Sequence, residues 1–281
     1  METEKTALPA SREEKMAHLL GVKKGHYTFD DLVMIMELLR GEGGCPWDRE
    51  QDHHSIRNDF IEETYEAVEA IDKDDPVHLR EELGDVLLQV VFHARIEDEA
   101  GRFDVYDVTN DICEKLIYRH PHVFGEVHVE NSQEVLTNWD ALKGVEKRAE
   151  RVTLTDTLRS IPAMEPALMR AQKVGKKAAC LDFGSAEEVY RKLDEEIAEV
   201  RAAADSGDKA AVEEEMGDLL LTVTSLCRKL GVKGEECLYH ATDKFIDRFS
   251  RVEQAVLARG QRMEDLPMSE LDAIWDSIKH T

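Results

Sequence analysis

The chain has 281 residues, of which 42% are hydrophobic, 34% charged and only 6% aromatic. This length suits two domains of about 100–200 residues each, and the composition favours helices over sheets. The formal net charge of −24, from 60 acidic and 36 basic side chains, argues against a nucleic-acid or anionic-membrane partner, because such a field would repel both.

The N-terminal segment METEKTALPASREEK lacks the apolar stretch of a signal peptide, and no later run approaches the roughly 18 apolar residues needed to cross a bilayer. The five cysteines form no CxxC pair, so neither a disulfide framework nor a zinc site is indicated. These features predict a reduced, cytoplasmic protein.

Two neighbouring segments place acids at helical spacing beside apolar residues: FIEETYEAVEAID (60–72) and LREELGDVLLQVV (79–91). Glu63 and Glu66 would share one helix face, as would Glu82 and Asp85 on the next helix. Four carboxylates packed together as anions need a cation between them, because mutual repulsion otherwise raises their pKa values. Oxygen ligands without His or Cys select Mg²⁺ or Mn²⁺ over zinc. A solvated acidic face is the simpler alternative.

The second half repeats this pattern at a shift of 133 residues, where 79–91 aligns with VEEEMGDLLLTVT (212–224) and seven of thirteen residues are identical. Both copies read EExxE, then fifteen residues, then ExxD, with a helix-weakening glycine before the final Asp. The repetition favours metal binding over a solvated face. The acids of the second copy are Glu195, Glu196, Glu199, Glu215 and Asp218, and those of the first begin at Glu62.

A third repeated element gives Lys and Arg four residues apart, in KLIYR (115–119) and KFIDR (244–248). Its register differs by four residues from that of the acids, and we expect the preceding loops to absorb the difference. Between the copies, SIPAMEPALMR (160–170) carries two prolines before a new apolar period. The predicted domains are therefore residues 1–160 and 161–281.

The combined motifs resemble the MazG family of all-α nucleoside triphosphate pyrophosphohydrolases, from about residue 28 to the C-terminus. GCPWDREQ (44–51) and IYRHPHVFGEV (117–127) add to the resemblance. The family implies two tandem helical bundles, a homodimer, and Mg²⁺-dependent cleavage of the α–β phosphoanhydride of NTPs and dNTPs, with Mn²⁺ as a substitute. It also implies ATP binding and broad base specificity.

Carried over residue by residue, the resemblance assigns the metal ligands to Glu196, Glu199, Glu215 and Asp218, and to Glu63, Glu66, Glu82 and Asp85 in the first copy. Glu195 and Glu62 are candidate general bases. The substrate-binding candidates are Lys192, Glu195, Glu196, Glu214, Lys244, Arg248, Trp275 and Lys279, with Lys115 and Arg119 in the first copy. Asn58 and Asp59 stand near the position of Lys192, so the first copy lacks that phosphate cation, and we expect the C-terminal site to carry most of the turnover.

Other functions stay open at this point. A more selective relative, of the dUTPase or phosphoribosyl-ATP pyrophosphohydrolase type, is the alternative among enzymes, and the tandem architecture with the CPWD and HPHVF stretches favours the MazG type over it. A di-metal carboxylate bundle for iron or oxygen chemistry would instead need Glu-x-x-His pairs, and none occurs beside these acids. A non-catalytic interaction module in either half is the third alternative.

Overall fold

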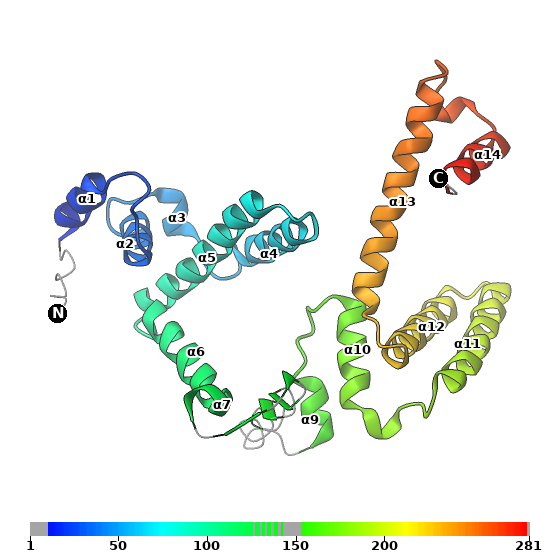
Figure 1. The fold of residues 1–281 in the computed structure, drawn as a ribbon, viewed down its shortest axis with the longest axis horizontal. Helices are drawn as coiled ribbons and strands as arrows, with labels where there is room; N and C mark the ends of the chain where they lie inside the picture. Colours follow the sequence, from blue (N-terminus) through cyan, green and yellow to red (C-terminus); the bar gives the residue numbers. More distant parts are fainter. Residues whose placement is uncertain are drawn as a thin grey trace. The chain divides into compact units, whose positions relative to one another are not determined.

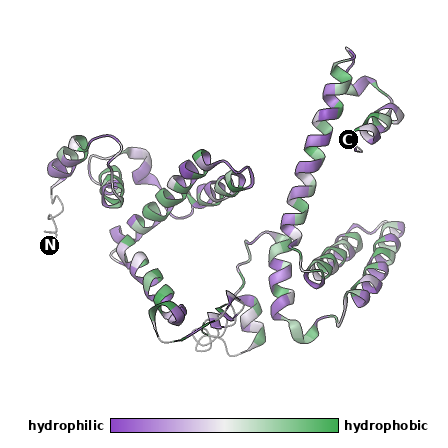
Figure 2. Ribbon diagram, in the orientation of Figure 1, coloured by the Kyte–Doolittle hydropathy of each residue, from purple (hydrophilic) through white to green (hydrophobic). Residues whose placement is uncertain are grey.

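The computed structural model describes residues 11–125, 127–129, 131, 132, 134, 135, 138, 139, 142 and 153–279. Every regular element in these ranges is a helix, which confirms the all-α prediction (Figure 1). Along the long helices, hydrophobic and hydrophilic residues alternate (Figure 2). Among the described helices, none is both long and apolar enough to span a membrane. The chain forms two compact units, Met1–Lys143 and Gly144–Thr281.

The first unit is built around a pair of packed helices, α4 and α5, with α2 and α6 against α5. Its described helices are α1 (Arg12–Gly21), α2 (Phe29–Arg40), α3 (Pro46–Glu50), α4 (Arg57–Asp72), α5 (Pro76–Glu99), α6 (Val105–Arg119) and α7 (Pro121–Phe124). The core contains Met36, Ile56, Val91, Phe92, Ala94 and Val105. Burial of these apolar side chains holds α5 between α2 and α6 and so fixes the helix that carries Glu82.

The second unit repeats the helix pair as α11 (Ala186–Ser206) and α12 (Lys209–Lys229), with α10 (Ala167–Lys177) packed on α12. Its other elements are α9 (Leu154–Arg159), η1 (Ala179–Leu181), α13 (Gly234–Leu257), η2 (Met263–Asp265) and α14 (Met268–Lys279). A buried cluster of Val252, Val256 and Ile274 joins α13 to α14.

Both helix pairs turn in the same way at matched positions of the repeat. Asp74 and Gly207 have φ angles of 51° and 74°, a left-handed conformation that glycine and, less often, aspartate adopt. In the next position Asp75 and Asp208 cap the second helix, each accepting hydrogen bonds from two backbone N–H groups. The repeated sequence therefore encodes a repeated hairpin.

The register slip between the copies lies mainly in a helix, which corrects the expectation that loops absorb it. Helix α5 has 24 residues and α12 has 21, so three of the four extra residues extend α5. Asp98 and Glu99 of this extension form ion pairs with Arg95, one turn earlier on the same helix. The two compact units meet between Lys143 and Gly144, and the predicted domain boundary near residue 160 stays a prediction. Pro166 is the N-cap of α10, and α9 contacts α10.

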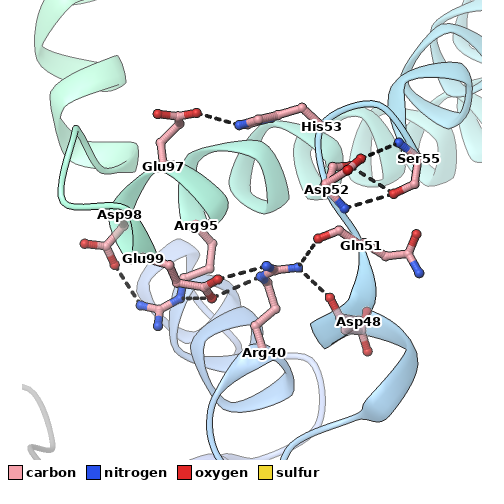
Figure 3. A network of polar contacts seen from close by, with 10 residues as sticks. All are labelled: Arg40, Asp48, Gln51, Asp52, His53, Ser55, Arg95, Glu97, Asp98 and Glu99. Atoms are coloured by element: carbon pink, nitrogen blue, oxygen red, sulfur yellow. Dashed lines mark hydrogen bonds and ion pairs between the residues drawn. The ribbon is translucent and has the colours of Figure 1, made fainter.

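A polar network fastens the GCPWDREQ segment to the end of α5 (Figure 3). The Arg40 side chain donates hydrogen bonds to the carbonyl oxygens of Asp48 and Gln51, and its Nη2 lies 2.8 Å from Glu99 Oε2. His53 Nε2 lies 2.5 Å from Glu97 Oε1. This motif therefore anchors the loop that leads into α4, the helix with the first three acids.

Candidate active site

The helix pair of the first unit brings three of its four predicted ligands together. One carboxylate oxygen each of Glu63, Glu66 and Glu82 lies within 4.8 Å of the others. Asp85 lies outside this group, yet its charge raises the pKa of Glu63, after the larger effect of burial. Glu66 and Glu82 act on Glu63 in the same direction. The four acids thus form one electrostatically coupled cluster, which we call the N-terminal cluster.

The C-terminal cluster gathers a different subset of the same repeat positions. Here the converging oxygens belong to Glu196, Glu215 and Asp218. Glu199 is outside the group of three but, after burial, it is the largest electrostatic cause of the raised pKa of Glu215. Asp218 and Glu196 add to that shift, followed by Glu214. Glu214, the residue before Glu215 in the chain, therefore acts on the cluster through its charge.

Each cluster has one buried carboxylate with a basic residue four positions earlier on the same helix. Glu196 is only 3% exposed, and Lys192 Nζ lies 2.9 Å from its Oε1. Glu82 is 5% exposed, and His78 Nε2 lies 2.6 Å from its Oε1. In the second unit the basic residue therefore lies on the first helix of the pair, α11, whereas in the first unit it lies on the second helix, α5.

His78 was missed by the sequence reasoning, which compared the copies position by position and found Asn58 and Asp59 near the position of Lys192. A search for basic residues four positions before each acid would have found it, because residues i and i+4 are neighbours on a helix.

Lys192 lies among the acids of the C-terminal cluster. Its Nζ is 2.7 Å from Glu195 Oε1 and 3.8 Å from Glu199 Oε2, in addition to its contact with Glu196. Hydrogen bonds to Glu195 and then to Glu196 raise its pKa, so the side chain stays an ammonium cation. Glu195, the candidate base, is exposed and paired with this lysine, while Glu62 is exposed on α4.

The predicted nucleotide contacts of α13 and α14 form a separate set of interactions. Trp275 packs against Phe245, with ring centroids 5.4 Å apart, and belongs to the partly buried shell of the α13–α14 core. Lys244, beside Phe245 on α13, is exposed, as is Lys279 on α14. Among the described residues, no hydrogen bond or ion pair joins Lys244, Arg248 or Lys279 to the acids.

The matching residues of the first unit differ in burial. Lys115 is exposed, whereas Arg119 is only 9% exposed and its guanidinium lies 5.3 Å from the centre of the Trp139 ring. A cation–π contact of this kind stabilises the arginine where it is. Arg119 therefore has a packing role in addition to its assignment to the substrate.

The acids fit a hard divalent cation on chemical and structural grounds. Each group of three offers carboxylate oxygens only, the ligands that Mg²⁺ and Mn²⁺ prefer. Within the described part of the chain, Glu196 Oε2 is buried without a hydrogen-bond partner. An unpaired buried carboxylate oxygen is costly, and a cation at this position would offset the cost.

Comparisons with known proteins identify a family domain in each unit. The MazG nucleotide pyrophosphohydrolase domain matches the chain twice, over residues 51–124 and 185–252, and each match contains one acid cluster. The chain is 44% identical over 257 residues to the nucleoside triphosphate pyrophosphohydrolase of Escherichia coli K12, which covers 89% of this chain and 96% of that protein.

A second relative is the nucleoside triphosphate pyrophosphohydrolase/pyrophosphatase MazG of Thermotoga maritima. It is 40% identical over 260 residues, 92% of this chain and 98% of its own. The chain therefore belongs to the MazG family and is a hydrolase that acts on phosphoric anhydrides.

Proposed function

We propose that the protein cleaves the α–β phosphoanhydride of NTPs and dNTPs, giving a nucleoside monophosphate and pyrophosphate, with broad base specificity. The main support is the C-terminal cluster, where three carboxylates converge and one buried oxygen has no hydrogen-bond partner among the described residues. The names of the Escherichia coli and Thermotoga maritima relatives support a triphosphate substrate.

The residues divide the chemical work in this proposal. Glu196, Glu215 and Asp218, with Glu199 beside them, would hold Mg²⁺ or Mn²⁺. When bound, such a cation neutralises phosphate charge and lowers the pKa of a coordinated water. Glu195 would accept the proton of the attacking water. Lys192, Lys244 and Arg248 would offset the charge of the triphosphate, and Trp275 with Lys279 would bind the nucleoside.

The same roles in the first unit would fall to Glu63, Glu66, Glu82 and Asp85, with Glu62 as the base and Lys115 and Arg119 on the substrate. We propose that this site turns over more slowly, because a carboxylate, Asp59, stands at the repeat position of Lys192. The burial of Arg119 under Trp139 also supports this order of activity.

A homodimer is part of the proposal, because one chain leaves long apolar faces exposed. On α6 these include Ile112 and Leu116, and on α13 Phe245 and Phe249, each at least 41% exposed. Helix faces of this kind bury their apolar side chains against another element. A second copy supplies such elements, and we expect a dimer in a cytoplasmic setting.

Product analysis tests the proposed reaction. A panel of NTPs and dNTPs with Mg²⁺ in ¹⁸O-labelled water should release pyrophosphate, with the label in the monophosphate if water attacks the α-phosphorus. EDTA should stop the reaction, Mn²⁺ should restore it, and Zn²⁺ should restore it poorly, since no soft ligand is present. Release of inorganic phosphate instead, or full activity in EDTA, would exclude the proposal. A single accepted base would favour the more selective relatives.

A further inference from the structure

Lys192 lies within the C-terminal cluster, in contact with a carboxylate that we propose as a metal ligand. Its ammonium contacts Oε1 of Glu196 at 2.9 Å, and Glu196 is one of the three acids whose oxygens converge. The other oxygen of this carboxylate has no partner in the described residues. A divalent cation bound to Glu196 would therefore lie close to the ammonium.

Two cations in one cluster repel each other strongly. The repulsion grows as the charges approach each other, and the double charge of the metal increases it further. Lys192 is about a third exposed, so solvent weakens this effect. The side chain also has four rotatable methylene groups, which let its ammonium leave the acids without a change in the backbone.

We infer that Lys192 is a built-in competitor of the metal, which holds the C-terminal cluster until a triphosphate draws its ammonium away and frees Glu196. This inference rests on the proposed function, since it names the regulation of that site. Metal ions alone would bind weakly there, because they would have to displace the ammonium of Lys192. The metal and the nucleotide would both favour the state in which Lys192 has left Glu196, so each would strengthen the binding of the other. Glu195, released from Lys192 in the same step, would become free to accept a proton.

The N-terminal cluster offers an internal comparison, because the chain has Asp59 at the repeat position of Lys192. Its basic neighbour His78 belongs to the other helix of the pair. Changes at Lys192 should therefore leave metal binding by the N-terminal cluster unaltered.

Mn²⁺ titration of the full-length protein, followed by the electron paramagnetic resonance of free Mn²⁺, tests the inference without measuring turnover. The wild type should show two classes of site, and Glu215→Gln should remove the C-terminal class. Lys192→Met removes the charge but keeps the aliphatic stem, and should tighten the C-terminal class about tenfold. Lys192→Arg keeps the charge and should not tighten it.

Lys233→Met is the matched control. Lys233 also forms an ion pair with an acid on its own helix turn, Glu236, but it follows the end of α12. The rise along α12 separates Asp218 from Lys229, the last residue of that helix, by about 16 Å, and Lys233 comes four residues later. This control variant should bind Mn²⁺ as the wild type does.

A second titration includes an α,β-methylene triphosphate, which the proposed reaction cannot cleave. This nucleotide should tighten Mn²⁺ binding at the C-terminal class more in the wild type and Lys192→Arg than in Lys192→Met. Unchanged or weaker Mn²⁺ binding by Lys192→Met, in a protein that retains its helical circular dichroism, overturns the inference while the proposed function stands. Absence of any Mn²⁺ binding by the wild type overturns the proposed function itself.

Discussion

Removing Asp218 should inactivate the enzyme far more than removing the matched Asp85. Asp218 is one of the three acids whose oxygens lie within 4.8 Å of one another, whereas Asp85 lies outside the corresponding group of the first unit. Loss of one electrostatic stabiliser of a transition state typically costs 2.7–4 kcal/mol. Asp218 is exposed, so we expect about 3 kcal/mol for Asp218→Ala, roughly a hundredfold fall in kcat/KM. Asp85→Ala should cost less than about tenfold.

The assay measures pyrophosphate release with Mg²⁺ over a range of NTP concentrations, which gives kcat/KM. The variants are first matched for helical content by circular dichroism and for association by light scattering. Both variants relieve repulsion within an acidic cluster, so neither should destabilise the metal-free protein. Glu213→Ala is the control, because Glu213 is exposed on the same helix and has no part in the cluster. If Asp85→Ala abolishes hydrolysis while Asp218→Ala leaves it intact, the roles of the sites are reversed. If each retains about half, the sites are equivalent.

Three further outcomes follow from the same geometry. The pKa values of Glu63 and Glu215 are raised above the ordinary 4.5 in the folded protein, so the metal-free protein loses stability as the pH rises through these values. A bound Mg²⁺ would offset this loss, and Mg²⁺ should therefore raise Tm more at about pH 7 than at about pH 5. Gly217→Ala should raise the free energy of unfolding by up to about 1 kcal/mol in urea titrations, since an added Cβ meets no atom within 4 Å; destabilisation would show that another chain occupies that space. Light scattering at micromolar concentration should give a dimer, and Phe245→Asp or Leu116→Asp should weaken it; a wild-type monomer would contradict the exposed faces on α6 and α13.

The sequence predicted the helices and the two acid clusters because both depend on local spacing. Residues three and four apart share a helix face whatever surrounds them, so Glu63 with Glu66 and Glu215 with Asp218 could be paired from the sequence alone. Antiparallel packing of the two helices then followed from a short turn. The family resemblance supplied the reaction, which spacing alone does not specify.

What spacing could not predict is which acid of each cluster is buried, since burial depends on neighbouring helices. Glu196 is buried on α11, yet the matching Glu63 is only partly buried, and Glu82 on α5 takes that place in the first unit. The extension of α5 also escaped the sequence reasoning, which assigned the difference to the loops. Each helix ends two residues before a glycine of positive φ, Gly101 after α5 and Gly231 after α12, and the positions of these glycines would have located the extension.

The position of the buried acid decides where each cluster needs a basic partner. A buried carboxylate is costly without a nearby positive charge or hydrogen-bond donor. A basic residue four positions earlier on the same helix supplies that charge, because residues four apart are neighbours on a helix face. In the second unit this places Lys192 on α11, in contact with Glu195 and Glu196, which are the proposed base and a proposed metal ligand. In the first unit it places His78 on α5, four residues before Glu82 and on the opposite helix from Glu62. The two copies therefore share their acids but not the cation that would respond to a triphosphate, and this difference supports the unequal turnover proposed for the two sites.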